Sequence, residues 1–162
     1  GMERDATWLV KPAGRERGGG CMAMTVGDYA RVGQFMLDGG MARGKQILPT
    51  GWIAEATSRQ ISNGAPPAGY GYFWWLGQAG PYQASGIFGQ SIAVIPDERL
   101  VIVINAAWPK ATARELFVAR SAFHNAVRAA AQASGVRPKV EPCWPGVRTP
   151  RTSLFERTAE TG

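Results

Sequence analysis

Residues 70–105 read YGYFWWLGQAGPYQASGIFGQSIAVIPDERLVIVIN, and this stretch decides the expected fold. Aromatic and β-branched residues dominate it, and glycine and proline interrupt it at 77–81 and at Pro96-Asp97. Three or four β-strands joined by turns are therefore predicted. The last apolar run, Leu100–Ile104, is nearly continuous, which favours a central strand that is covered on both faces.

Helical segments are expected before these strands. Thr25 can cap a helix, Asp28 stands at the capping-box distance from it, and Gly39-Gly40 would end the helix. A tight hairpin around Gly44 and a short helix that carries Trp52 are predicted to follow.

A long amphipathic helix is predicted after the strands, over residues 110–134, and Gly135 would close it. Its apolar face is expected to pack on the sheet, and its polar face is expected to meet solvent. The apolar face carries Leu116, Ala119, Phe123, Val127 and Ala130, and the polar face carries Lys110, Arg114, Ser121, Asn125, Arg128 and Gln132.

These elements predict an α/β chain of the α+β type, in which helices flank an antiparallel β-sheet. The chain has 162 residues, of which 45% are hydrophobic, and can therefore fill one core. We divide it into an N-terminal arm and loop at 1–24, an α/β domain at 25–135 and a Pro- and Arg-rich tail at 136–162.

The charge and hydropathy of the chain argue against two kinds of partner. The net charge is +6, but the basic residues are scattered along the chain, so we expect no nucleic-acid surface. No apolar run reaches the roughly 18 residues of a membrane span, and no export signal is visible, so a soluble chain is expected. The cellular compartment stays open.

Residue types that bind metals are few and far apart. Cys21 and Cys143 belong to no CxxC pair, and His124 is the only histidine. We therefore expect no metal site and no histidine-based triad, while a disulfide between the two cysteines stays open.

The segment Ala84-Ser85-Gly86-Ile87 is the first candidate for chemistry. It is followed by Phe88-Gly89-Gln90, and both glycines remove a side chain where another group must approach the backbone. One interpretation is half of an oxyanion hole, because a strand edge offers rigid N–H donors to a ligand carbonyl. The other interpretation is a glycine bulge in an antiparallel sheet.

Three segments together resemble a known family. They are GGGCMAMTVGDYARVGQFMLDGGMARGKQILPTGWIAEAT at 18–57, YGYFWWLG at 70–77 and ASGIFGQSIAVIPDERLVIVIN at 84–105. In order and spacing they are similar to the C-terminal half of the serine β-lactamase-related hydrolases, which include penicillin-binding proteins, esterases and amide hydrolases. The resemblance implies a β-lactamase/transpeptidase-like fold without its N-terminal strands and helical domain, and it implies no cofactor.

Members of that family carry three active-site motifs, and the resemblance supplies a counterpart for the third alone. That motif is a Lys/His-x-Gly triplet, here Ala84-Ser85-Gly86, and the resemblance places the oxyanion N–H at Ile87. Ala84 stands where many relatives have a basic residue, which favours an esterase or amidase over a β-lactamase. Further candidates for substrate binding are Tyr72, Trp74, Gly89 and Gln90.

The first two motifs of the family have no counterpart in this sequence. No serine is followed by lysine three places later, and no tyrosine is followed by asparagine two places later. Both motifs would belong to a helical domain that precedes residue 1. We therefore expect a portion of a hydrolase for an ester, amide or β-lactam that is inactive on its own.

Weaker candidates carry structural interpretations as well. Tyr72, Trp74 and Trp75 could line an acyl pocket, but alternating aromatic residues on a strand more often belong to a core. Ser121 and His124 are one helical turn apart, and both are expected to face solvent on a surface helix that offers no pocket.

An alternative function belongs to another class. The chain could be a non-catalytic binding or oligomerisation module, because removal of the N-terminal elements would leave sheet edges and apolar surface exposed. In that case its partner would be a peptide or a second copy of the chain.

Overall fold

The computed structural model describes residues 1–16, 20–61, 69–78 and 80–135. Its central element is a four-stranded antiparallel sheet with the order β5-β6-β7-β8. The strands are β5 (Trp75–Leu76), β6 (Tyr82–Ser85), β7 (Ser91–Ile95) and β8 (Leu100–Ile104). The prediction of three or four strands in this stretch is confirmed, and the chain is of the α+β type.

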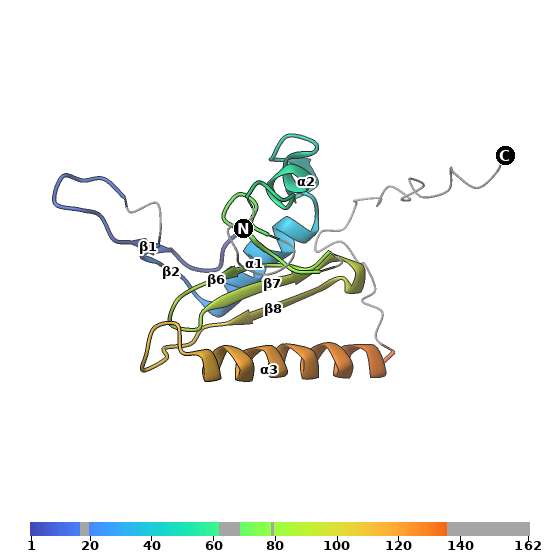
Figure 1. Ribbon diagram of the computed structural model, residues 1–162. Helices are drawn as coiled ribbons and strands as arrows, with labels where there is room; N and C mark the ends of the chain where they lie inside the picture. The colour runs from blue at the N-terminus through green and yellow to red at the C-terminus, as the bar shows by residue number, and fades with distance from the viewer. Residues whose placement is uncertain (17–19, 62–68, 79, 136–162) are drawn as a thin grey trace.

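The sheet lies between two helical layers (Figure 1). The helix α1 (Val26–Leu37) covers one face, and α3 (Arg114–Ala133) covers the other. Side chains alternate along β7, so Val94 packs into a cluster with Met36 of α1, whereas Ala93 and Ile95 point to the opposite face. The helix α3 contributes Val127 to that second cluster.

The start of α1 follows from its cap. The Thr25 side chain accepts a hydrogen bond from the Asp28 N–H at 3.1 Å, as the capping box predicts. The Asp28 carboxylate is completely buried and accepts further bonds from the backbone N–H groups of Glu3 and Arg4. A Cβ at Gly33 would lie 2.4 Å from a Val101 methyl carbon, so this glycine lets α1 approach the sheet closely.

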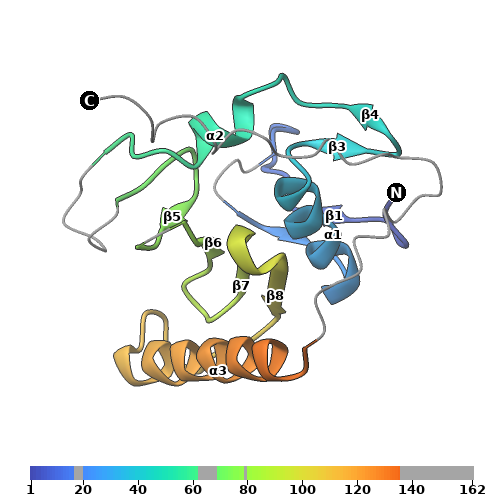
Figure 2. The same ribbon diagram turned by 90° about the vertical axis from the view of Figure 1, so that its right-hand side faces the viewer.

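Smaller elements complete the described part of the chain. Figure 2 shows the hairpin of β3 and β4 together with α2 on the α1 side of the sheet, away from α3. The hairpin around Gly44 and the short helix with Trp52 are therefore confirmed. The bounds are β1 (Thr7–Trp8), β2 (Met22–Ala23), β3 (Met41–Ala42), β4 (Lys45–Gln46), α2 (Trp52–Ala56) and the 3-10 turn η1 (Pro96–Glu98).

The expectation that Leu100–Ile104 is a central strand is not met within the described residues. Within the described residues β8 is an edge strand, since β7 is the only strand that pairs with it. The expected coverage of both faces is confirmed and accounts for the continuous apolar sequence, because α1 and α3 cover the two faces of β8 while its outer edge pairs with no described strand. A sequence reports how the faces of a strand are covered, but it does not report how many neighbours the strand has.

The long helix differs from the prediction in its start and in its inward face. It begins at Arg114 instead of Lys110, and Phe123, expected on the inward face, is 53% exposed. Ala119 and Ala130 are exposed as well. The face toward the sheet carries two polar residues instead, Arg120 and His124.

Candidate functional site

The Ala84–Ile87 segment lies at the end of β6 and in the hairpin turn that follows it. The strand ends at Ser85, and the Gly86 N–H donates to the Gln90 carbonyl at 2.8 Å. The Gly89 N–H donates to the Gly86 carbonyl at 3.2 Å, which closes a β-turn with Ile87 at its first corner. Ile87 is thus on a turn, whereas the sequence favoured a strand edge.

The conformation of this turn explains its second glycine. Gly89 has a φ of +94°, and Ile87 and Phe88 are not among the residues with positive φ. A β-turn followed by one left-handed residue is a common connection in hairpins, and glycine adopts that conformation without steric cost. The glycine therefore has a structural role that does not depend on any ligand.

The Ile87 N–H is not used by the hydrogen bonds of the turn itself. The first corner of a β-turn does not take part in closing it, and the Ile87 N–H donates to no acceptor among the described residues. The Ile87 side chain is 57% exposed, so the turn lies at the surface of the described structure.

The loop before α3 holds this turn in place. The Thr112 N–H donates to the Ile87 carbonyl at 2.8 Å, and the Trp108 N–H donates to the Phe88 carbonyl at 3.0 Å. The Trp108 ring packs so closely that a Cβ at Gly89 would lie 2.2 Å from its Cε2 atom. Both corners of the turn are therefore tied to a second segment of the chain.

A buried arginine, which the sequence analysis did not single out, lies beneath the turn. Arg120 donates to the Ser85 hydroxyl at 2.9 Å and to the carbonyl oxygens of Gln90 and Gly89 at 3.3 and 3.4 Å. Desolvation by burial lowers the pKa of this guanidinium. A helical face drawn through Ala113, Phe117, Arg120, His124 and Val127 would have found it, but arginine is rarely placed in a core on sequence grounds.

The expectation that His124 faces solvent beside Ser121 is wrong. His124 Nε2 lies 3.4 Å from the Oγ atom of Ser91, a residue of β7 that is 3% exposed. Desolvation and then the charge of Arg120 lower the pKa of His124. Ser121 instead donates to the Phe117 carbonyl at 2.9 Å within its own helix. The two residues therefore form no Ser–His pair.

The aromatic candidates lie on the other side of the sheet. Trp74 packs against the core, where its ring meets Tyr82 edge to face at a centroid distance of 5.1 Å. The Tyr72 hydroxyl donates to Glu55 Oε1 at 2.7 Å, and its ring lies 5.7 Å from that of Trp52 in α2. The contacts of these two candidates are thus with the core and α2, whereas Gly89 and Gln90 belong to the turn and its hydrogen bonds.

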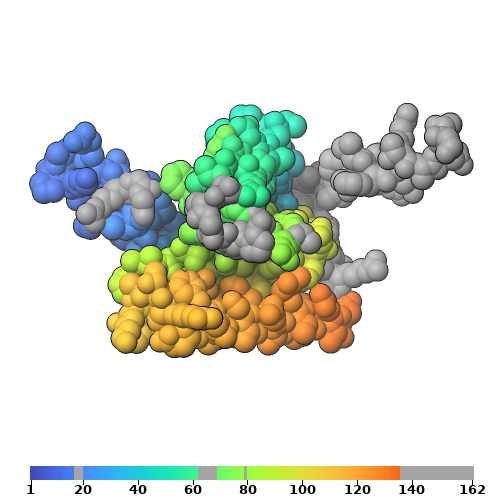
Figure 3. All heavy atoms as spheres, in the orientation of Figure 1, coloured from blue at the N-terminus to red at the C-terminus, as the bar shows by residue number. Residues whose placement is uncertain are grey.

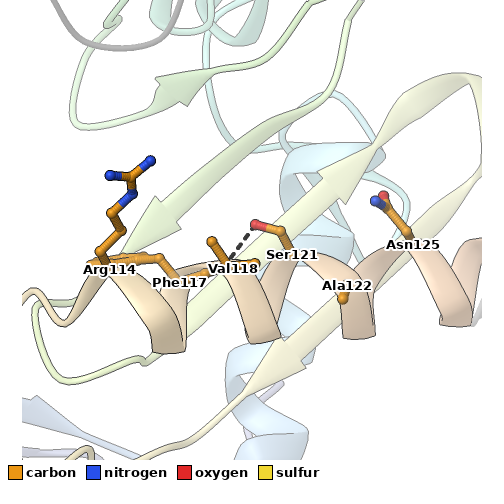
Figure 4. Close-up of a pocket in the computed structure, with 6 residues that line it drawn as sticks. All are labelled: Arg114, Phe117, Val118, Ser121, Ala122 and Asn125. Atoms are coloured by element: carbon orange, nitrogen blue, oxygen red, sulfur yellow. Dashed lines mark hydrogen bonds between the residues drawn. The ribbon is translucent and has the colours of Figure 1, made fainter.

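A shallow hollow on α3 offers no second site for chemistry. Figure 4 shows the six residues that line it, all from successive turns of this helix. Ser121 is the one residue of these six that carries a hydroxyl group. That hydroxyl donates a hydrogen bond to its own helix, drawn as a dashed line. The lining residues are Arg114, Phe117, Val118, Ser121, Ala122 and Asn125.

The residues that the structure describes lack the features of a metal site and of a membrane span. They contain no group of three or more His, Cys, Asp or Glu side chains that could hold a metal ion. None of their helices combines the length and the apolar character that a membrane crossing needs. Cys143 lies outside the described residues, so whether it pairs with the exposed Cys21 stays open.

Comparisons with known proteins agree with one another. The sequence profile of the family described as Beta-lactamase matches residues 1–124. A 6-aminohexanoate-dimer hydrolase from Paenarthrobacter ureafaciens is 32% identical over 118 residues, which cover 66% of this chain and 30% of that protein.

A solved structure shows the same fold. It is a putative 6-aminohexanoate-dimer hydrolase from Bacillus anthracis, with a TM-score of 0.69 and 24% sequence identity, and the match covers 82% of this chain and 35% of that one. This chain therefore spans about a third of the length of these two similar proteins.

Proposed function

The chain belongs to the beta-lactamase family, and on that basis we propose that it forms the C-terminal wall of a serine-hydrolase active site. In this proposal the Ile87 N–H is one donor of the oxyanion hole. The Ser-x-x-Lys and tyrosine motifs would come from a preceding part of a longer protein, and the chain alone would be inactive.

The observation that carries the proposal is the geometry of the Gly86–Gly89 turn. An oxyanion donor must be free, exposed to substrate and fixed in direction before the reaction starts. The Ile87 N–H has no acceptor among the described residues, and backbone hydrogen bonds from Thr112 and Trp108 hold both corners of the turn. It also follows directly after Ala84-Ser85-Gly86, the counterpart of the third family motif.

The proposed reaction is acyl transfer to a serine and then to water. The serine oxygen would attack the substrate carbonyl carbon and pass its proton to the lysine of the first motif. The carbonyl oxygen becomes an oxyanion, which the Ile87 N–H binds. The bond to the leaving alcohol or amine then breaks as that group takes up a proton, and water hydrolyses the acyl-enzyme.

An amide or ester is the favoured substrate class. Ala84 carries no charge at the position where a basic residue would bind the carboxylate of a β-lactam. The names of two similar proteins, both 6-aminohexanoate-dimer hydrolases, support an amide. This substrate class is a proposal because the chain spans about a third of those proteins.

Hydrolysis assays test the proposal in two steps. The purified chain should not hydrolyse nitrocefin, p-nitrophenyl esters or the 6-aminohexanoate dimer above the buffer rate. Turnover that is abolished by Ser85→Ala would overturn the proposal, because it would place a nucleophile in this chain.

The second step restores the missing motifs. We expect activity from a chimera in which this chain replaces the matched segment of the Paenarthrobacter relative. Ile87→Pro in that chimera removes only the N–H, since proline suits the first corner of such a turn, and should lower kcat about 10²- to 10³-fold. Ile87→Ala keeps the N–H and is the matched control, so an equal loss in both variants would contradict the role of this donor.

A second candidate function is a non-catalytic binding or oligomerisation module. It is favoured by the position of β8, whose outer edge pairs with no strand in the described part of the chain. An apolar edge without a partner is a template for another strand. Light scattering discriminates, because a chain that stays monomeric at high concentration would count against this function.

A further inference from the structure

Arg120 is buried but has no acidic partner in the described structure. The exposed fraction of Arg120 is 8%. The arginines that form ion pairs in the described structure are Arg31, Arg99 and Arg128. A buried charge is costly in free energy unless hydrogen bonds and neighbouring dipoles compensate for the lost water. The position of Arg120 therefore depends on the neutral groups around it.

These neutral acceptors belong to both arms of the β6–β7 hairpin. The Ser85 hydroxyl lies at the end of β6, and the carbonyl oxygens of Gly89 and Gln90 lie where the chain returns toward β7. One planar guanidinium thus bridges the two strands at the base of the turn. Because its donors have fixed directions, arginine holds several acceptors in a defined relative position, which a single ammonium group does not.

Two aromatic rings pack against the guanidinium of Arg120 and hold it in place. Its central carbon lies 4.9 Å from the centroid of Phe117 and 5.5 Å from that of Trp108. The two rings meet edge to face at 4.8 Å, with an interplanar angle of 90°. Trp108 also donates its backbone N–H to the Phe88 carbonyl, so arginine, rings and turn form one connected cluster.

From this cluster we propose that Arg120 is a positioning residue, which orients the Gly86–Gly89 turn so that the Ile87 N–H is directed at the substrate oxyanion. The inference rests on the proposed function of that N–H. Arg120 acts through Ser85 and the carbonyl oxygens of the turn and does not touch the reacting atoms. Its positive charge, which forms no ion pair in the described structure, also favours negative charge at the turn.

Amide hydrogen exchange of the purified chain tests this role. Arg120→Lys keeps the charge but cannot reach the three acceptors with fixed geometry. We expect exchange at the Gly86 and Gly89 N–H groups to become about tenfold faster, with a change in the Ile87 amide chemical shift. Exchange at Val94 in the core of β7 should change much less. Arg114→Lys, the same substitution at an exposed position of α3, is the matched control and should leave the turn unchanged.

Ser85→Ala gives a second, milder variant in case Arg120→Lys does not fold. It removes one acceptor and should also loosen the turn relative to Val94. The effects of the two substitutions should be less than additive, because both break the same contact. Unchanged exchange at Gly86 and Gly89, or an equal increase at Val94, would overturn the proposal.

The test separates this inference from the proposed function. Exchange and chemical shift report whether Arg120 orders the turn, whether or not the chain belongs to an active hydrolase. The Ile87→Pro chimera reports whether the turn supplies an oxyanion donor. An ordered turn together with an inert chimera would leave the positioning role in place and remove its catalytic purpose.

Discussion

His124 and Arg120 lie one turn apart on α3, and both are turned toward the sheet. His124 contacts Ser91 of β7, and Arg120 contacts Ser85 of β6, which is the residue opposite Ser91 in the sheet. Two serine hydroxyls of one cross-strand pair thus meet two basic side chains. This polar layer is coupled electrostatically, because the charge of Arg120 contributes to the low pKa of His124.

Protonation of His124 should destabilise the fold. Desolvation and the Arg120 charge lower the pKa of His124 below the ordinary histidine value of 6.5, so the unfolded chain binds this proton more readily. Stability is then lost as the pH falls through about 6.5 toward the lower folded pKa. Urea unfolding across this range should show a midpoint that decreases on acidification.

The matched variants isolate this histidine. His124→Gln should remove the decrease in the urea midpoint, and Arg120→Met should raise the His124 pKa seen by NMR because it removes a nearby positive charge. A wild-type midpoint that does not change over this range would contradict the burial of a neutral His124.

At the scale of elements, the β6–β7 turn predicts different costs for its two glycines. A Cβ atom at Gly89 would lie 2.2 Å from an atom of the Trp108 ring, and the φ of Gly89 is +94°. A Cβ at Gly86 would lie 2.4 Å from Gln90 Oε1, the end of a flexible side chain, and Gly86 has no positive φ. The packed Trp108 ring cannot move away easily, whereas the end of the Gln90 side chain can.

We expect Gly89→Ala to lower the free energy of unfolding by about 2 kcal/mol or more, and Gly86→Ala to lower it by about 1 kcal/mol or less. Denaturant unfolding of the two variants measures both values. Equal costs at the two positions would mean that the Trp108 contact does not hold the turn as described.

The helix α3 shows what can be predicted from hydrophobic periodicity alone. Its approximate place and its contact with the sheet could be predicted from the 110–134 pattern, but its first residue and its rotation could not. Phe123 is exposed while Arg120 is buried, because the guanidinium finds three oxygen acceptors and two aromatic rings on the sheet side. A hydrophobicity pattern assigns every arginine to solvent. The orientation inferred from it is therefore rotated about the helix axis relative to the observed orientation.

For the whole molecule, the position of β8 predicts self-association of the isolated chain. Its five residues are all apolar, and within the strand there is no charge, proline or bulge that would protect the edge. Sedimentation or light scattering should show dimers or larger species whose fraction rises with concentration. Figure 3 shows α3 as a broad exposed ridge of the molecule, which offers a surface for the control.

Two matched substitutions locate the contact. Val103→Lys places a charge on β8 and should shift the chain toward monomer, whereas Val118→Lys places the same charge on an exposed position of α3 and should not. Circular dichroism checks that both variants fold. Monomeric wild-type protein, or an equal effect of both substitutions, would contradict association through β8.

The strands, the α1 cap, the β3–β4 hairpin and the family to which the chain belongs could all be inferred from the sequence. These depend on local features, namely the alternation of apolar residues, turn glycines and capping side chains, which act between neighbours in the chain. The counterpart of the third family motif at Ala84–Gly86 was inferred from the resemblance, and both this assignment and its role in the chain are still predictions.

Three features became visible only in the folded structure: β8 is an edge strand among the described residues, α3 turns Arg120 and His124 inward, and Ile87 lies at the corner of a turn that a second segment holds. The second and third of these features share a physical cause. Each depends on groups that are far apart in the sequence, such as the Ser85 and Arg120 pair, 35 residues apart. Such contacts compensate for the burial of polar groups, and no local pattern in the chain records them.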